Sequence, residues 1–180
     1  YFGKSRRVTL YGVGPDFAVS LRMRVATGEF LPQEDPRSAR AFAVLGSKVA
    51  REFFGTENPL GSRIRIGGER YRVIGVMQSK GQVLGFDLDD TVFIPVSRAL
   101  DMFNRESLQE IHVTYEPTAP VAEVEQGIKR ILIARHGAED FTVTPQQKML
   151  EVFGTVLNAI TFAVAAMGAI SLVVGGVGIL

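Results

Sequence analysis

The chain has 180 residues, with 20 Lys or Arg against 19 Asp or Glu, which gives a formal net charge of +1. Domains that bind nucleic acid carry a clear basic excess, so this balance argues against that class. The chain has no cysteine and two histidines, His112 and His136, which lie far apart in the sequence. This composition excludes disulfides and thiolate sites, and it predicts no catalytic residues, no metal site and no cofactor.

The first forty residues predict a strand, a turn and a short helical or extended segment, followed by a loop. Apolar and alternating residues occupy 8–32, with breaks at Gly12, Gly14 and Pro15. Segment 32–40 is polar and contains two prolines, which is typical of a loop.

Segment 41–55 predicts a short strand followed by a helix. Residues 41–45 are apolar, and Ser47 is a suitable N-cap for a helix that Gly55 would end. The apolar face of this helix is expected to comprise Val49, Ala50, Phe53 and Phe54.

The next segment predicts a β-hairpin. Residues 63–66 alternate between charged and apolar types, Gly67 and Gly68 form a two-residue turn, and 71–74 return. Alternation places four arginines on one face of this hairpin: Arg63, Arg65, Arg70 and Arg72. One interpretation is a solvated strand face. The alternative is a docking patch for an acidic partner or a lipid headgroup.

Residues 78–91 predict a long exposed loop that carries three carboxylates, Asp87, Asp89 and Asp90. A calcium loop needs further ligands at fixed positions, so we interpret this group as a solvated turn. Segment 92–96 is an apolar strand whose Pro95 favours a sheet edge or a strand end, and 97–103 predicts a short helix.

Segment 110–143 predicts a strand, a helix and a strand, in a βαβ-like unit. Residues 110–115 alternate, an amphipathic helix runs from Pro120 to Gly137, and 140–143 form the last strand. His112 falls on the polar side of the first strand without a partner, so a structural role is the preferred interpretation.

The C-terminal residues predict one long helix that enters a membrane. Thr144 and Gln147 form a capping box, and no charged residue follows Glu151. A helix over 145–180 would be about 54 Å long, whereas a bilayer core is about 30 Å thick. We therefore predict a stalk helix at 145–158 and a truncated transmembrane helix at 159–180. We expect both chain ends to be boundaries within a longer polypeptide.

Small residues recur at a spacing of four within the apolar run, and such positions let membrane helices approach closely. The predicted packing positions are Ala159, Ala163, Ala165, Ala169, Ser171 and Gly175. A lone membrane anchor with tolerated small residues is the alternative interpretation.

The segment VLGSKVAREFFGTENPLGSRIRIGGERYRVIGV, residues 44–76, resembles the MacB-like periplasmic core domain of ABC transporter permeases of the MacB/FtsX-like family. DLDDTVFIPV at 87–96 and ISLVVGGVGIL at 170–180 are similar to the same family. The resemblance implies an α+β fold. An extracytoplasmic domain of two lobes at 1–144, with βαβ-like units and an inserted strand-rich lobe at about 32–106, would precede the stalk and transmembrane helix.

The resemblance also implies a function. The chain would belong to a permease subunit of an ABC transporter, whose extracytoplasmic domain couples cytoplasmic ATP hydrolysis to export or mechanotransmission across the cell envelope. It would lie in the bacterial inner membrane, with 1–144 on the extracytoplasmic side. The implied partners are an ABC ATPase subunit or domain, a second permease copy, and a periplasmic adaptor or a regulated hydrolase.

Two other functions are weighed against this one. The sequence contains no Gly-x-x-x-x-Gly-Lys-[Ser/Thr] loop, so we expect any ATPase to lie elsewhere and this segment not to be an enzyme. A singly anchored extracytoplasmic binding or sensor domain is the alternative, with helix 145–180 as a tether. A hydrolase is disfavoured because no nucleophile, base and acid can be assembled. The cargo stays open.

Overall fold

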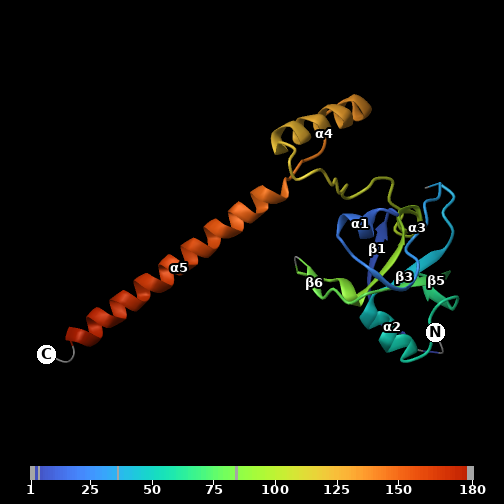
Figure 1. Cartoon of the computed structure of the whole chain (residues 1–180), viewed down its shortest axis with the longest axis horizontal. Coiled ribbons are helices and arrows are strands. Elements are labelled where there is room, and N and C mark those ends of the chain that lie inside the picture. The colour runs from blue at the N-terminus through green and yellow to red at the C-terminus, as the bar shows by residue number, and fades with distance from the viewer. Residues whose placement is uncertain (1–2, 4, 36, 84, 178–180) are drawn as a thin grey trace. The chain divides into compact units, whose positions relative to one another are not determined.

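The computed structural model of the chain describes residue 3 and residues 5–35, 37–83 and 85–177 (Figure 1). Contacts divide the chain into two compact units, Tyr1–Thr114 and Tyr115–Leu180. The first unit contains a β-sheet with helices, and the second contains two helices. The predicted α+β class with a long C-terminal helix is confirmed.

A six-stranded mixed sheet is the centre of the first unit, among the residues that the structure describes. The strand order is β1 (Thr9–Val13), β8 (Thr91–Pro95), β3 (Phe42–Leu45), β5 (Glu69–Met77) and β2 (Val25–Gly28), and β4 (Arg63–Ile66) also pairs with β5. Strands from before residue 32 thus join strands from 32–106 in one sheet.

The sheet buries side chains on both faces because successive residues of a strand point in opposite directions. Ala43, Leu45 and Val73 belong to one core cluster, which also includes Val49 and Phe54 of α2 (Ser47–Phe54). Side chains that alternate with them, together with α1 (Phe17–Ser20), form the second cluster: Val13, Ala18, Met23, Leu31, Val44, Met77, Leu88 and Phe93. Each face is therefore covered.

One local detail differs from the sequence prediction, and another decides between two alternatives that the prediction left open. Gly46 is the N-cap of α2, with an extended backbone, and Ser47 is already the first helical residue. Pro95 ends β8, but β8 lies between β1 and β3, so Pro95 marks a strand end and not a sheet edge. The following helix α3 (Val96–Met102) begins directly after it.

Segment 78–91 is more ordered than the predicted exposed loop. It contains a two-stranded ladder, β6 (Gln82–Val83) with β7 (Phe86–Asp87), and a 3-10 helix, η1 (Leu88–Asp90). Leu88 is buried in the second core cluster. This apolar side chain helps to anchor the segment to the sheet.

The second unit contains α4 (Val121–His136) and α5 (Gln146–Val177). Gly137 ends α4 in the left-handed conformation at φ 80°, as its position predicted. The two strands predicted at 110–115 and 140–143 are not formed. A strand needs a neighbour to satisfy its backbone groups. Segment 140–143 lies in the second unit, whose described residues form two helices and no strand, and residues 110–114 of the first unit pair with none of its described strands.

The parallel crossover typical of a βαβ unit occurs elsewhere in the chain. Strands β3 and β5 pair in parallel, with Phe42 beside Arg72, and the chain between them passes through α2. The apolar face predicted for α2 packs on this pair, since Val49, Ala50 and Phe54 are buried. The arrangement expected at 110–143 is thus found at 42–77.

Candidate functional site

The β4–β5 hairpin is formed as the sequence predicts. Gly67 and Gly68 occupy the two turn positions with φ of 56° and 93°, and a positive φ at both positions is typical of a type I′ turn. This tight turn fixes the register, in which Arg63 lies opposite Arg72 and Arg65 lies opposite Arg70. The four arginines therefore form two like-charged cross-strand pairs on one face.

We call this surface, made of Arg63, Arg65, Arg70 and Arg72, the arginine face. All four side chains are exposed, while the alternate residues Ile64 and Ile66 pack against the first core cluster. A surface hollow of about 300 Å³ lies among Arg63, Ile64, Arg65 and Arg70. The arginine face is thus carried on a strand pair that the core holds in place.

No carboxylate among the described residues forms an ion pair with any residue of the arginine face. Glu69 at the start of β5 lies on the opposite face, where its carboxylate accepts a hydrogen bond of 3.3 Å from Tyr71 Oη. Burial, followed by the charge of Glu69, raises the pKa of Tyr71 to about 12. Glu69, the carboxylate within the hairpin, therefore bonds to Tyr71 on the core side and does not neutralise the arginine face.

Arg40, in the same unit, is an arginine whose charge is neutralised by a neighbouring carboxylate. Its guanidinium forms an ion pair with Glu34 and lies 4.5 Å from the ring centre of Phe42. Hydrogen bonds from the Arg40 backbone and side chain hold the pKa of Glu34 below its usual value. The arginine face lacks such an arrangement within the described residues.

The carboxylates of the second predicted cluster serve to fold a turn. Asp87 caps η1 by accepting hydrogen bonds from the backbone N–H groups of Asp89 and Asp90. Asp89 accepts from three donors: Ser79 Oγ at 2.5 Å, Lys80 N at 2.8 Å and Gly81 N at 3.1 Å. Burial raises the pKa of Asp89, but these hydrogen bonds outweigh it and lower the pKa overall. The described residues contain no cluster of three potential metal ligands.

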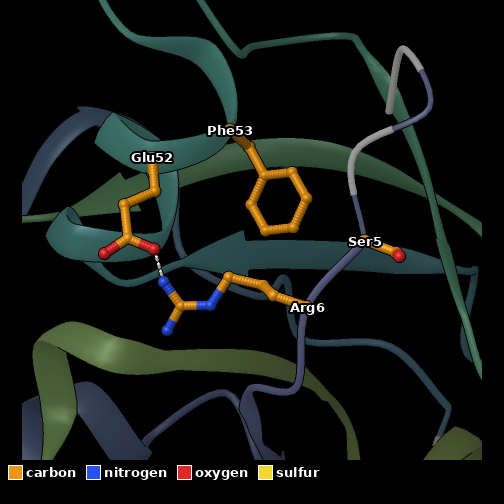
Figure 2. Close-up of a pocket in the computed structure, with 4 residues that line it drawn as sticks. All are labelled: Ser5, Arg6, Glu52 and Phe53. Carbon is orange, nitrogen blue, oxygen red and sulfur yellow. Dashed lines mark ion pairs between the residues drawn. The ribbon is translucent and has the colours of Figure 1, made fainter.

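Arg6 is a residue that the sequence prediction missed. It forms ion pairs with Glu52 of α2 and Asp90 of η1, and Lys48 Nζ lies 3.1 Å from the same Asp90. Figure 2 shows Arg6 reaching towards Glu52 with the ring of Phe53 nearby. The pairing joins residues far apart in the chain, so no local spacing signals it.

The hollow beside Arg6 is too small for a substrate site. It has a volume of about 130 Å³ and is lined by Ser5, Arg6, Glu52 and Phe53 (Figure 2). Sites for small molecules usually measure about 300–1,000 Å³. We interpret Arg6 as a structural residue whose ion pairs hold the N-terminal segment against α2 and η1.

The two histidines have local partners. His112 Nε2 lies 3.4 Å from Glu110, and its ring packs edge-on against Phe17 with centres 6.0 Å apart. His136 Nδ1 lies 2.9 Å from Asp140, one turn beyond the end of α4. These contacts support structural roles for both side chains.

Helix α5 has the length and composition of a membrane span. Its 32 residues run from Gln146 to Val177 without a break, and it is the one helix among the described residues with these properties. The helix begins one residue after Pro145, close to the predicted capping box. The last three residues of the predicted span 159–180 lie outside the described residues.

The predicted packing positions do not share one side of α5. A helix advances by about 100° per residue, so the pair Ala159 and Ala163 points about 120° away from Ala165 and Ala169 and from Ser171 and Gly175. Ser171 Oγ donates to the Met167 carbonyl within the helix at 2.9 Å. One neighbouring helix therefore cannot contact all three pairs.

The sequence matches a known family over residues 1–131, described as the MacB-like periplasmic core domain. The macrolide export ATP-binding/permease protein MacB of Marinobacter nauticus is 36% identical over 166 residues, which cover 91% of this chain and 26% of that protein. MacB of Rhodospirillum rubrum is 35% identical over 184 residues, which cover 99% and 28%. The chain therefore spans less than a third of the length of these relatives.

A solved structure also resembles the chain. The periplasmic region of MacB from Actinobacillus actinomycetemcomitans aligns with a TM-score of 0.64 and 22% sequence identity, covering 81% of this chain and 64% of that chain. This likeness shows a common fold.

Proposed function

Because this chain belongs to the MacB-like periplasmic core domain family, we propose that it is the extracytoplasmic part and one membrane helix of an ABC transporter permease subunit. In this proposal the sheet unit lies outside the inner membrane of a bacterium, and α5 enters the bilayer. Cytoplasmic ATP hydrolysis, on a subunit or domain beyond this segment, moves the extracytoplasmic domain through α5. The segment itself is not the enzyme and binds no cofactor.

The continuity of α5 is the observation that carries the proposal. Its 32 residues correspond to about 48 Å of helix, which exceeds a bilayer core of about 30 Å. The surplus includes the polar residues Gln146, Lys148 and Glu151. A helix that leaves the membrane without interruption transmits a push or a rotation, whereas a flexible tether absorbs it.

Ion pairs within the second unit connect the first turn of α5 to α4 and to the segment between the two helices. Lys148 Nζ in the first turn of α5 lies 4.0 Å from Glu125 of α4. Lys129 of α4 lies 3.4 Å from Glu125 and 3.3 Å from Glu139, which belongs to the connection to α5. Exposed ion pairs are individually weak, but this network spans both helices and their connection.

The partners follow from the proposed role. An ABC ATPase must supply the energy, and a second permease copy would place two such helices side by side. A periplasmic adaptor or a regulated hydrolase would receive the movement. A sensor domain with a single anchor is the other function that one membrane-length helix suits, and the family membership favours the permease.

Prolines in α5 test the proposal. The full-length permease and its ATPase are reconstituted in proteoliposomes. A fluorophore is attached at Arg37→Cys, and energy transfer from it to acceptor lipids reports the distance between the domain and the bilayer. The chain has no native cysteine, so this label is unique within it. We expect ATP to change the energy transfer, and Val152→Pro with Val156→Pro to abolish that change while ATP turnover continues.

Gln146→Pro is the matched control, because proline is tolerated in the first turn of a helix. This variant should keep the response to ATP. An unaltered response in the double-proline variant would contradict the lever mechanism. No response to ATP in the unmodified protein would favour the sensor domain.

A further inference from the structure

We propose that the arginine face of the β4–β5 hairpin docks an acidic segment of a partner protein in extended conformation. The inference rests on the hairpin's geometry, and it uses the proposed function only to place this face outside the bilayer. The partner is defined by chemistry: a strand-like segment in which Asp or Glu occupies alternate positions.

The hairpin holds together charges that repel each other. Arg63 faces Arg72 and Arg65 faces Arg70 in direct cross-strand pairs, and like charges in such positions destabilise a hairpin. No described carboxylate relieves this repulsion, although Glu34 relieves Arg40 in the same unit. An external anion would convert the repulsion into attraction.

The spacing of the arginine face matches an extended acidic segment. Residues two apart on a strand are separated by about 6.6 Å on the same face, so Arg63 and Arg65 repeat at the interval at which alternate carboxylates of a partner strand repeat. Guanidinium groups bind carboxylates through two parallel hydrogen bonds, which favours such a register. The core fixes the strands and thereby limits the ordering cost of binding.

An open strand edge lies beside these charges. Among the described strands, β4 pairs with β5 alone, and its other edge pairs with no strand. An edge strand of this kind accepts an additional strand through its backbone groups. A strand added there would place its alternate side chains beside Arg63 and Arg65.

The surroundings favour a protein over a lipid surface. Proteins that lie on a membrane insert large apolar side chains beside their cations. Within the hairpin itself, residues 63–72, no large apolar side chain is exposed, and the exposed Phe103 lies beyond the turn, next to Met102. The arginine face offers charge and hydrogen bonds without an apolar anchor.

A synthetic peptide of alternating Thr and Glu tests the inference. The full chain is placed in nanodiscs of phosphatidylcholine, and peptide binding is followed by fluorescence anisotropy. We expect binding roughly tenfold tighter than that of the matching Thr-Gln peptide, and a loss of roughly tenfold in Arg63→Glu with Arg65→Glu. The control Arg24→Glu with Arg130→Glu makes the same change in net charge at exposed sites, and it should retain binding.

Several outcomes would overturn the inference. Equal losses in the test and control variants would mean attraction to net charge alone. Binding of the unmodified chain to phosphatidylglycerol vesicles in preference to the peptide, with the same dependence on Arg63 and Arg65, would assign the arginine face to lipid. Near-UV circular dichroism checks folding, and Arg63→Gln with Arg65→Gln provides a milder variant that should also lose binding. Because the assay needs no ATP, its failure is distinct from failure of the lever mechanism.

Discussion

Arg63 lies directly opposite Arg72 across the β4–β5 hairpin, with both side chains exposed on the same face. The pair places two positive charges at directly opposite cross-strand positions. This relationship costs stability and is maintained by the tight Gly67-Gly68 turn and by the packing of the opposite face.

Removing one charge of the pair should therefore stabilise the unbound chain. We expect Arg63→Gln to raise the free energy of unfolding by about 0.2–1 kcal/mol at low salt, because an unfavourable cross-strand pair is lost. Thermal unfolding followed by near-UV circular dichroism of the tyrosines measures the change. The gain should shrink at 1 M salt, where exposed charges are screened.

Arg24→Gln is the control for this measurement, since Arg24 is exposed outside the hairpin. It should leave the unfolding free energy unchanged. A loss of stability in Arg63→Gln that persists at high salt would mean that Arg63 has a stabilising contact.

Asp89 should make stability sensitive to acid. Its pKa is lowered in the folded chain from an ordinary value of 3.8, so its contribution is fully present above that value. The contribution is lost as the pH falls through the folded pKa. We expect Asp89→Asn to reduce stability by about 1–2 kcal/mol at pH 7 and to flatten the decline in stability below pH 4.

Glu57→Gln makes a similar chemical change at an exposed position after α2 and serves as the control. Denaturant unfolding from pH 2.5 to pH 7 compares the variants. If Asp89→Asn kept the full acid dependence of the unmodified chain, the three hydrogen bonds would not be what stabilises the carboxylate.

Gly12 sets the distance between β1 and α3. A Cβ at this position would collide with the Cβ of Ala99, whereas a Cβ at Gly14 would meet nothing within 4 Å. We expect Gly12→Ala to destabilise the sheet unit by about 1–3 kcal/mol through overpacking. Gly14→Ala, the matched control, should stay within about 0.5 kcal/mol.

A double substitution checks the cause. Gly12→Ala combined with Ala99→Gly should lose less stability than the sum of the two single changes, because the collision is removed. Additive losses in thermal unfolding would show that α3 does not limit this site.

The sequence predicts the local features of this fold well. The Gly67-Gly68 turn, the apolar stripe of α2 and the left-handed Gly137 each depend on residues within a few positions of one another. Such features can be predicted because the residues that determine them are close together in the sequence. The register of the hairpin, and with it the arginine face, followed from the two-residue turn together with the alternation of the flanking residues.

Non-local features were beyond this reasoning. Thr9 pairs with Thr91 in a parallel ladder, and Arg6 pairs with Asp90. Neither contact has a periodic or spacing signal because the partners are far apart in the chain. The strand that the alternation at 110–115 predicted is not formed, because no described strand pairs with this segment.

The small residues of α5 predict which sides of the helix contact other membrane helices. The three pairs point about 120° apart, so leucine at Ala163, Ala169 or Gly175 probes three directions separately. In the full-length permease we expect leucine to lower the thermal stability at each side that meets a helix, by an overpacking cost of about 1–3 kcal/mol. A side that faces lipid should tolerate leucine, since leucine suits a hydrocarbon environment.

Val173→Leu is the control, because it adds one methylene group at a position that already carries a large exposed side chain and points about 60° away from the two nearest pairs. It should leave thermal stability close to that of the unmodified protein. Tolerance of leucine at all three pairs would overturn the helix-packing prediction and would favour a lone anchor. A loss at one or two pairs would identify the protein-facing sides of α5, because each pair reports on a direction that the others do not contact.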